Sequence, residues 1–496
     1  MKKNILPFIM VFIGQFLSAQ APTELEIHKS DRFVEKNKAN DINVLCKLDN
    51  GNLFTLRFGK KYCIADLMND KLEFITKVTI KKGKKEAYKG HVRLGDKVKV
   101  FTVDATDKSE RIINCYIFDL LNGSYEKRQL VRLPIIRGKT FFKDEHSIQT
   151  GFDISGNNRY VAIAMGSAKR KKCHFYMYVF DSDNLKTIYK NKYEENDTLG
   201  FEPKGILVDN EGSIFLLKKV WIHTDAYAFT SDDEIENYQF QLQSLHEVDT
   251  KTIKITSEGK FIKSLRMRSV NNTIQLLGCY ADKGYDRIEG TCTFTVNKAD
   301  LTVKSSKTNI FTKKIFEDVF NSDENPWLLG FSIDRIIENK NGVAHMILVK
   351  TKPSEDFFDN FDNSPFMFQT DGSFKLTLLI LKVNPSGELV WGRGIYKLSE
   401  HYDFNAFVKN EKLHLLLNSG EKVLNNPEKK VIFKERSLGF TALYDVVYDT
   451  DGNVTYHKVH NNESQKFYMP ISGLFADGYF LVSNKDRFDR KYMLLN

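Results

Sequence analysis

Short apolar segments separated by tight polar turns recur along the whole chain. In one recurring pattern an apolar residue is followed by a polar or glycine-containing turn and then by a run rich in β-branched and aromatic residues. Its eight instances begin at Leu48, Leu94, Ile154, Val208, Val270, Ile337, Val408 and Phe475, with a mean interval of about 61 residues. Strand-forming runs joined by short turns predict β-hairpins, and a fixed period predicts a repeat architecture.

A second pattern alternates with the first. It is a β-rich run that ends in Asp or Asn before a tight turn, at Asp66, Asp119, Asp181, Asp249, Asn297, Asn384 and Asp449. Asp and Asn suit this position because their side chains accept hydrogen bonds from backbone N–H groups within the turn. One hairpin of each kind in every repeat predicts units of about four antiparallel strands.

Together the two patterns resemble the secreted bacterial β-propellers whose blades carry a D-x-x-G-N/E-hydrophobic turn. Asn384–Trp391 and Asp209–Leu216 come closest to that turn, whereas no WD, kelch or aspartate-box consensus is kept. The resemblance covers roughly residues 40–490 and implies an all-β propeller of about eight four-stranded blades. Seven blades are an alternative, because the last unit is short and needs a strand near Glu24–Val34. Two β-sandwiches side by side are the other architecture considered.

The amino terminus has the layout of a secretory signal peptide. Lys2 and Lys3 precede an apolar run over residues 5–17, and the small residues Ser18 and Ala19 follow. The run is shorter than the roughly 20 residues that span a bilayer, which makes a membrane anchor the weaker alternative. We therefore expect a signal peptide over residues 1–19, one propeller domain over residues 20–496, and a periplasmic or extracellular location without a transmembrane segment.

Composition and charge narrow the classes of partner. Apolar residues make up 42% and charged residues 28%, as in an ordinary globular protein, and the formal charge of +9 falls to about +7 without Lys2 and Lys3. The basic runs 81–85 and 169–172 could touch an anionic surface, or they could be solvated tips and protected strand edges. No aromatic RNA-binding signature accompanies them, so we expect no nucleic-acid partner, and we expect a monomer.

The six cysteines show no metal-binding spacing. An exported chain can oxidise its thiols, and Cys279 and Cys292 lie on two predicted strands of one hairpin. A disulfide between them requires directly opposed positions, so the hypothesis depends on the strand register. Buried free thiols are the expectation for the other four.

The predicted topology separates the connections into two sets on opposite faces. The turns within both patterns are short, whereas insertions accumulate in the other set, at Lys219–Tyr238, Ala281–Glu289, Phe311–Leu328, Thr351–Ser373 and Ser419–Ser437. Repeat proteins place such insertions on the binding face. Aromatic rings beside polar groups suit a sugar or a peptide. The candidate ligand-binding residues are Trp221, His223, Tyr227, Asp232, Trp327, Asp356, Phe358, Asp359 and Phe361.

A catalytic alternative uses connections near the propeller axis. Two of these connections carry a histidine beside carboxylates, and their candidate residues are Glu145, His146, Glu400, His401 and Asp403. Such groups could act as a base and the group that orients it in a hydrolase or lyase, or they could bind a metal, although ordinary loop residues give the same pattern. No nucleophile elbow, zinc-protease motif or nucleotide fingerprint occurs, and we predict no cofactor and no metal site. The predicted function is therefore an exported binding module for a glycan, peptide or envelope partner, and enzyme activity is left open.

Overall fold

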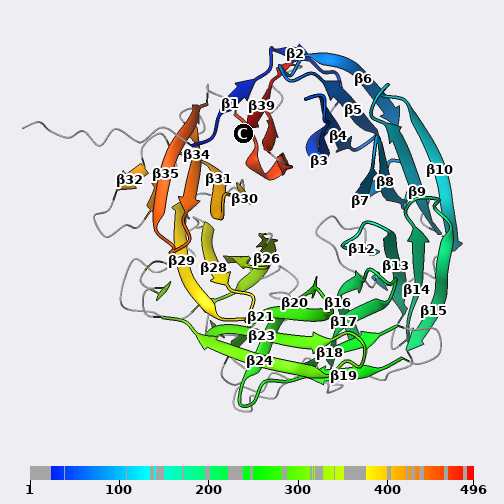
Figure 1. The fold of residues 1–496 in the computed structure, drawn as a ribbon, viewed down its shortest axis with the longest axis vertical. Helices are drawn as coiled ribbons and strands as arrows, with labels where there is room; N and C mark the ends of the chain where they lie inside the picture. The colour runs from blue at the N-terminus through cyan, green and yellow to red at the C-terminus, as the bar shows by residue number, and fades with distance from the viewer. Residues whose placement is uncertain are drawn as a thin grey trace, which may run out of the picture.

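Eight sheets, each built on four antiparallel strands, form a closed ring in the computed structural model, so the chain is an all-β propeller (Figure 1). The eight-bladed prediction is confirmed, and the alternatives of seven blades and of two β-sandwiches are wrong. The structure describes residues 24–37, 39–107, 109–134, 139–140, 150–169, 172–195, 201–221, 238–245, 250–281, 287–312, 315–316, 318, 328–339, 341–350, 376–398, 404–420, 423–425, 431–434, 441–462, 467–476, 478–483 and 489–496. The predicted signal peptide lies outside these residues.

The first four blades follow one another in chain order, each starting at the centre of the ring. Blade 1 contains β3 (Ala39–Lys47), β4 (Leu53–Gly59), β5 (Tyr62–Met68) and β6 (Phe74–Lys81). Blade 2 contains β7 (Glu86–Leu94), β8 (Lys97–Asp104), β9 (Glu110–Asp119) and β10 (Tyr125–Pro134). Blade 3 contains β12 (Thr150–Ile154), β13 (Tyr160–Lys169), β14 (Lys172–Asp181) and β15 (Thr187–Glu195), with the short β11 (Lys139–Thr140) beside β13. Blade 4 contains β16 (Phe201–Val208), β17 (Ile214–Trp221), β18 (Tyr238–Ser244) and β19 (Thr252–Ile255).

The next three blades keep this order and carry extra strands. Blade 5 contains β20 (Phe261–Val270), β21 (Thr273–Ala281), β23 (Gly290–Asn297) and β24 (Val303–Ile310), and nearby β22 (Arg287–Ile288) pairs with β25 (Leu328–Leu329). Blade 6 contains β26 (Phe331–Glu338), β27 (Ala344–Lys350), β28 (Leu376–Val383) and β29 (Leu389–Leu398), extended by β33 (Val431–Lys434) and β32 (Val423–Asn425). Blade 7 contains β30 (Phe404–Lys409), β31 (Lys412–Gly420), β34 (Thr441–Tyr448) and β35 (Val454–Asn461).

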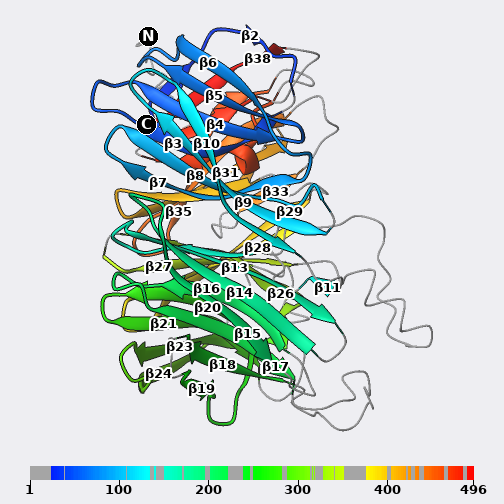
Figure 2. The same cartoon turned by 90° about the vertical axis from the view of Figure 1, so that its right-hand side faces the viewer.

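The eighth blade joins the two ends of the chain and closes the ring. It contains β36 (Leu474–Phe475), β37 (Tyr479–Val482) and β39 (Tyr492–Leu495), preceded by the 3-10 turn Pro470–Ser472, and its outermost strand is β1 (Ile27–Lys29). In register, Ile27 lies opposite Leu495. Beside this blade β2 (Phe33–Val34) pairs with β38 (Asp489–Arg490) (Figure 2). The predicted completion of the last unit by a strand within residues 24–34 is confirmed.

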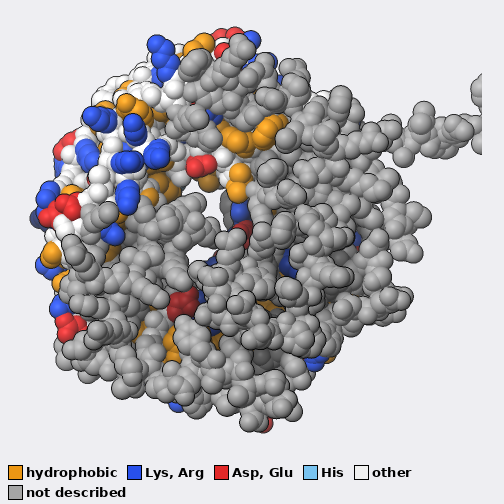
Figure 3. Space-filling model, turned by 180° about the vertical axis from the view of Figure 1, so that it is seen from behind, with side chains coloured by type: hydrophobic (Ala, Val, Ile, Leu, Met, Phe, Trp, Pro, Cys, Tyr) orange, Lys and Arg blue, Asp and Glu red, His pale blue; other side chains and the backbone are white. Residues whose placement is uncertain are grey.

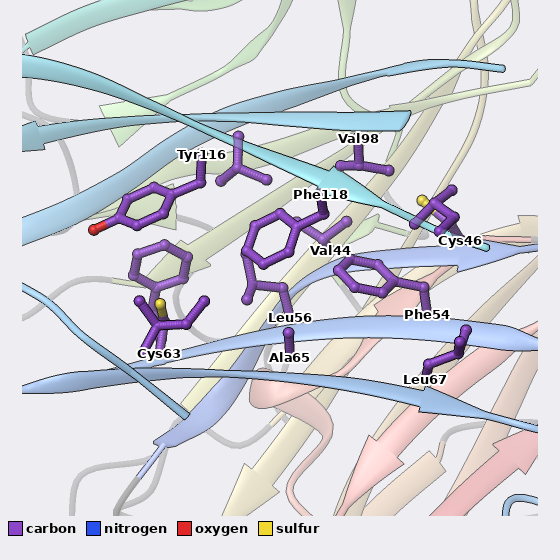
Figure 4. Packing of buried hydrophobic residues seen from close by; sticks show 14 of the residues in the cluster. Val44, Cys46, Phe54, Leu56, Cys63, Ala65, Leu67, Val98, Tyr116 and Phe118 are labelled. Atoms are coloured by element: carbon purple, nitrogen blue, oxygen red, sulfur yellow. The ribbon is translucent and has the colours of Figure 1, made fainter. Parts of the chain in front are cut away.

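Apolar side chains fill the space between neighbouring blades. Between blades 1 and 2 the rings of Phe54 and Phe118 lie 5.4 Å apart at 50°, and the free thiols of Cys46 and Cys63 share the same core (Figure 4). Burial, followed by the nearby charge of Glu86, raises the pKa of Cys63 to about 12, so this thiol stays protonated. These cysteines therefore act as small core residues.

A buried group of charged residues, the closure cluster, ties blade 8 to blade 1. Its members are Glu35, Arg57, Asp66, Lys77, Arg490 and Tyr492. Arg57 donates two hydrogen bonds to the Glu35 carboxylate, at 2.8 and 2.7 Å, and one to Asp66 at 2.9 Å. The Tyr492 hydroxyl donates to the same Asp66 oxygen at 2.6 Å, from the last strand of the chain. No covalent connection runs from β39 to β1 within blade 8, so the β1–β39 pairing and these contacts join the carboxyl-terminal strands to the amino-terminal part of the chain.

Two sequence predictions are corrected by the register. Asp66 was expected to end a strand, but it lies inside β5, and the turn that follows is held by Asn69, which accepts from Lys71 and Glu73 N–H. The Cys279–Cys292 disulfide is also wrong. Cys292 lies opposite Gly278, one residue out of register with Cys279, so the two thiols face opposite sides of the sheet and are free.

Candidate binding face

The strand order places the connections on two faces of the ring. Turns between the first and second strands and between the third and fourth strands of a blade lie on one face, which we call the turn face. The connection between the second and third strands and the step to the next blade lie on the opposite face, which we call the connection face. This geometry follows because successive strands of a blade are antiparallel, so every second connection lies on the same face.

Turns on the turn face are held by hydrogen bonds from the preceding blade. Lys99 of blade 2 donates to the Ser182 carbonyl of the blade 3 turn at 2.9 Å. Between blades 6 and 7, Lys382 donates to the Thr450 carbonyl at 2.8 Å, and Arg393 donates to the Gly452 carbonyl at 2.9 Å. The Asp and Asn turns of the second sequence pattern therefore join neighbouring blades, and the turn face is a structural surface.

Glycine is required at one of these turns. Gly452 has a φ of +80°, and a Cβ atom there would lie 2.8 Å from the Trp391 ring of blade 6. The indole N–H of Trp391 donates to the Thr450 carbonyl at 3.1 Å, so the ring cannot move away without losing this contact. Both the backbone conformation and the close approach exclude a side chain.

Connections on the opposite face differ widely in length. Blade 1 crosses from β4 to β5 with Lys60 and Lys61 alone. Blade 4 leaves residues 222–237 between β17 and β18, and blade 6 leaves residues 351–375 between β27 and β28. The insertions predicted from sequence therefore emerge from this face, on a scaffold whose other face is tightly held.

Trp221 is the candidate ligand-binding residue whose surroundings the structure describes. It ends β17, is half-buried, and packs edge to face on Tyr238 with ring centroids 5.7 Å apart. The Lys219 ammonium lies 4.7 Å from the centroid of the Trp221 ring. The Tyr238 ring in turn packs against the Phe261 ring of blade 5, with ring centroids 4.9 Å apart. The indole thus has a packing role where the blade 4 insertion begins, with part of its surface left accessible.

Most of the predicted site residues lie outside the described residues. Among the ligand-binding candidates these are His223, Tyr227, Asp232, Trp327, Asp356, Phe358, Asp359 and Phe361, and among the catalytic candidates they are Glu145, His146, Glu400, His401 and Asp403. Their assignments remain predictions.

Carboxylates of comparable connections do have described structural roles. Glu35 and Glu86, which precede or begin the inner strands of blades 1 and 2, lie 3.2 and 3.0 Å from Lys77 and Lys127 on the outer strands. In the connection to blade 6, Asp318 lies 2.5 Å from Arg393 of the outer strand. An acid before the inner strand paired with a base on the outer strand is thus a recurring device. It favours a structural role for acids that follow the same pattern.

Glu86 shows how completely such an acid is satisfied. Its carboxylate accepts from Thr102 at 2.7 Å, Asn114 at 3.0 Å, Tyr116 at 3.1 Å and Lys127 at 3.0 Å. Burial alone would raise the pKa of Glu86, but the hydrogen bonds from Thr102, the Gly83 N–H and Lys127, with the Lys127 charge, hold this pKa below its usual value. The carboxylate therefore stays ionised and fixed.

One described acid near the ring centre behaves differently. Asp153 on the inner strand β12 accepts a hydrogen bond from the Val208 N–H of blade 4 at 2.6 Å, with no cation pairing it in the described part of the chain. Burial raises the pKa of Asp153 to about 7. The hydrogen bonds from the backbone N–H groups of Val208 and Ile154 lower this pKa, but by less than burial raises it. A carboxyl group that titrates near neutrality has the protonation behaviour of a general acid or base. Within the described ranges, no three His, Cys, Asp or Glu residues gather as a metal site.

Comparisons with known proteins give distant structural similarity alone. No protein-family model and no curated protein matches the chain. Among solved structures, one of two prolyl endopeptidases studied together aligns with 90% of this chain and 55% of its own, at 9% identity and a TM-score of 0.40. The WD40 domain of SCAP from fission yeast aligns with 95% of this chain and 94% of its own, at 6% identity and a TM-score of 0.41. The β-propeller domain of the trilobed protease from Pyrococcus furiosus aligns with 83% of this chain and 94% of its own, at 8% identity and a TM-score of 0.37.

In the part of the chain that the structure describes, no helix is long and apolar enough to cross a membrane.

Proposed function

We propose that the protein is an exported binding propeller that holds a glycan, peptide or envelope partner with its connection face. The observation that carries this proposal is the contrast between the two faces. Short turns bonded to the preceding blade occupy one face, and connections of very unequal length leave the other. Loops that vary on a rigid scaffold are where binding residues concentrate.

A binding screen with matched deletions tests this function. The chain from Gln20 onward is applied to glycan and peptide arrays, alone and after residues 351–373 are replaced by a short Gly-Ser linker. We expect the deletion to abolish binding of the selected ligand without changing the melting temperature, because these residues fall between β27 and β28 in the sequence and belong to neither strand. A second deletion, within residues 222–237, tests the other long connection, which contains the candidate residues His223, Tyr227 and Asp232. Undiminished binding by both deleted proteins would contradict the proposal.

A hydrolase or lyase that works near the ring centre is the second candidate function. Asp153 favours it, because this acid lies on an inner strand and its pKa is raised to about 7. We expect an enzyme of this kind to lose turnover in Asp153→Asn or in a His146→Ala/His401→Ala double variant. A binding protein keeps its ligand affinity in both. Hydrolysis of the array ligand by the wild-type protein and by neither variant would decide for the enzyme.

Export follows from the amino-terminal segment and is tested separately. We propose cleavage before Gln20, and the measurement is the amino-terminal sequence of the protein recovered from the periplasm or the medium. Recovery of the full chain from the membrane fraction would contradict it.

A further inference from the structure

Five exposed lysines meet on the connection face of blade 1, although the sequence separates them into two groups. Lys60 and Lys61 form the step from β4 to β5, and Lys81, Lys84 and Lys85 lie at or after the end of β6. We call these five residues the lysine patch. The two segments are neighbours because Tyr62 lies opposite Lys81 in register and because the Lys82 N–H donates to the Lys61 carbonyl at 3.0 Å.

A sixth, buried lysine holds these two segments together. The Lys82 ammonium donates to the carbonyls of Lys60 at 3.3 Å, Gly83 at 3.2 Å and Glu86 at 2.6 Å. The Glu86 carboxylate closes the same turn by accepting from the Gly83 N–H at 3.0 Å. Three carbonyls around one ammonium fix the backbone that carries the patch, so its charges are presented on a rigid support.

The patch is not neutralised by the protein itself. Across the described residues no ion pair includes any of its five lysines. Of the acids close to this turn in the sequence and the fold, Glu86 pairs with Lys127, and Asp104 accepts from the Thr106 N–H at 2.8 Å. Seen from behind, Lys and Arg side chains gather at the upper left of the molecule, the part of the ring where Figure 1 places β5 and β6 (Figure 3). A rigid, unpaired group of like charges attracts counter-ions.

Blade 3 also has lysines at the connection-face ends of two strands. There β13 ends at Lys169 and β14 begins at Lys172, which lie opposite each other in register at the connection face. Protection of a sheet edge does not explain these residues, because Lys169 and Lys172 lie on the two middle strands of their blade. In the run 81–85, only Lys81 belongs to an outer strand.

We propose that the lysine patch, together with the Tyr62 ring, binds a polyanionic glycan, a polysaccharide that carries sulfate or phosphate groups. The inference rests on the proposed function in taking the connection face as the binding surface, and it names the ligand class. Tyr62 is half-buried and lies opposite Lys81 in register, and an aromatic ring is a surface on which a sugar can pack. Lysines bind anionic groups as point charges, and the patch contains no Arg, Asn or Gln of the kind that reads base edges. Insertion into a lipid surface would need exposed apolar side chains, and among the described residues the two segments contain no large apolar side chain that is exposed.

The test compares two quadruple variants that lose the same charge. Lys60→Gln/Lys61→Gln/Lys84→Gln/Lys85→Gln removes four of the five lysines of the patch. The control, Lys71→Gln/Lys97→Gln/Lys186→Gln/Lys304→Gln, removes four exposed lysines at turn-face ends of strands. Heparin is the probe, and its affinity is measured by calorimetry between 50 and 200 mM salt. We expect the patch variant to bind at least roughly tenfold more weakly and with a shallower salt dependence, because fewer counter-ions are released. The control should bind like the wild-type protein.

A third variant and two competitors identify the ligand class. Tyr62→Ser should weaken heparin binding severalfold while leaving the salt dependence unchanged, because it removes a sugar platform and no charge. Equal loss in both quadruple variants, or wild-type affinity in the patch variant, would overturn the proposal. So would competition by duplex DNA or by anionic phospholipid vesicles as effective as that by heparin itself. The protein without residues 351–373 should keep its heparin affinity even if it loses its array ligand, so the two proposals can fail separately.

Discussion

Blade 1 carries two groups of positive charge that are built in opposite ways. In the closure cluster Arg57 is fully buried and its guanidinium reaches two carboxylates and a carbonyl. In the lysine patch the side chains are exposed, and among the described residues no ion pair includes them. The first group joins the two ends of the chain, whereas the second lies on the face from which the long connections emerge.

The comparison shows how burial decides what a charge does. A buried ion pair cannot be broken cheaply, because the charge left behind remains in a medium of low dielectric constant. An exposed lysine is solvated, contributes little to stability and keeps its charge available to a partner. Substitutions in the closure cluster should therefore lower stability and leave ligand affinity unchanged. Substitutions in the lysine patch should lower ligand affinity and leave stability unchanged.

Arg57→Ala should give the largest effect. It leaves Glu35 and Asp66 buried without their principal donor, and removing one partner of a buried ion pair costs about 3–5 kcal/mol. We expect a loss of this size in the free energy of unfolding, measured by urea denaturation, and no change between 50 and 500 mM salt. Arg57→Lys keeps the charge but not the two-pronged hydrogen bonding, and it should lose less.

Arg128→Ala is the matched control for that substitution. Arg128 pairs with Glu126 at 2.6 Å on the outer strand of blade 2, where both side chains are exposed. Exposed pairs contribute about 0–1 kcal/mol. A similar loss of stability in both variants would mean that burial does not separate the two kinds of charge.

Acid titration should affect the closure cluster next. Burial alone would raise the pKa of Glu35, but the hydrogen bonds and charge of Arg57, with Lys77 and Arg490, hold it below its usual value. The unfolded chain therefore takes up a proton near pH 4.5 that the folded protein does not, so stability is lost as the pH falls from there through the folded pKa. One carboxyl group contributes at most about 1.4 kcal/mol per pH unit.

Glu35→Gln should reduce the slope of the free energy of unfolding against pH in this acid range, because one proton fewer is taken up on unfolding. The comparison is Glu126→Gln, on the solvent-exposed side chain, and the measurement is urea denaturation at intervals from pH 3 to 6. If both variants show the same pH dependence of unfolding free energy as the wild-type protein, the cluster does not hold Glu35 ionised.

The repeat could be predicted from the sequence because its signals are local. The Asp side chain of Asp181 accepts from the N–H groups of Asp183 and Asn184 at 3.0 Å each, as the turn pattern requires. Asp66 has the same local appearance, but its partners are Arg57 and Tyr492, the latter 426 residues away. An acid that ends a strand and an acid buried in a seam can be distinguished only through such distant partners.

Register and assembly account for the other differences. Whether Cys279 opposes Cys292 depends on a shift of one residue, which composition and spacing do not determine. The lysine patch joins Lys61 to Lys81 through strand pairing, so its size could not be read from either basic run alone. Of the candidate site, the sequence could predict the face and the residues entering its insertions, and Trp221 shows that such a residue can also pack on its own blade.

Lys82→Met should have an intermediate effect. The substitution keeps most of the apolar stem and removes the ammonium that three carbonyls accept from. Burial lowers the pKa of Lys82 and Glu86 opposes this, so the group is a buried cation at the edge of the patch. We expect a loss of about 1–2 kcal/mol in urea denaturation. Heparin affinity should fall as well, although no exposed charge is removed. Unchanged affinity would show that the patch does not depend on a fixed backbone.

The smallest stability effect should come from removing the patch itself. The Lys60→Gln/Lys61→Gln/Lys84→Gln/Lys85→Gln variant loses four exposed charges that no described carboxylate pairs with, so its free energy of unfolding should stay within about 0.5 kcal/mol of the wild-type value. Any change should be a gain at low salt, because like charges on neighbouring segments repel each other and salt screens this repulsion. Denaturation at 20 and 500 mM salt measures both expectations. A loss of several kcal/mol would mean that the lysines hold the blade together, and their charge could then no longer be assigned to a partner.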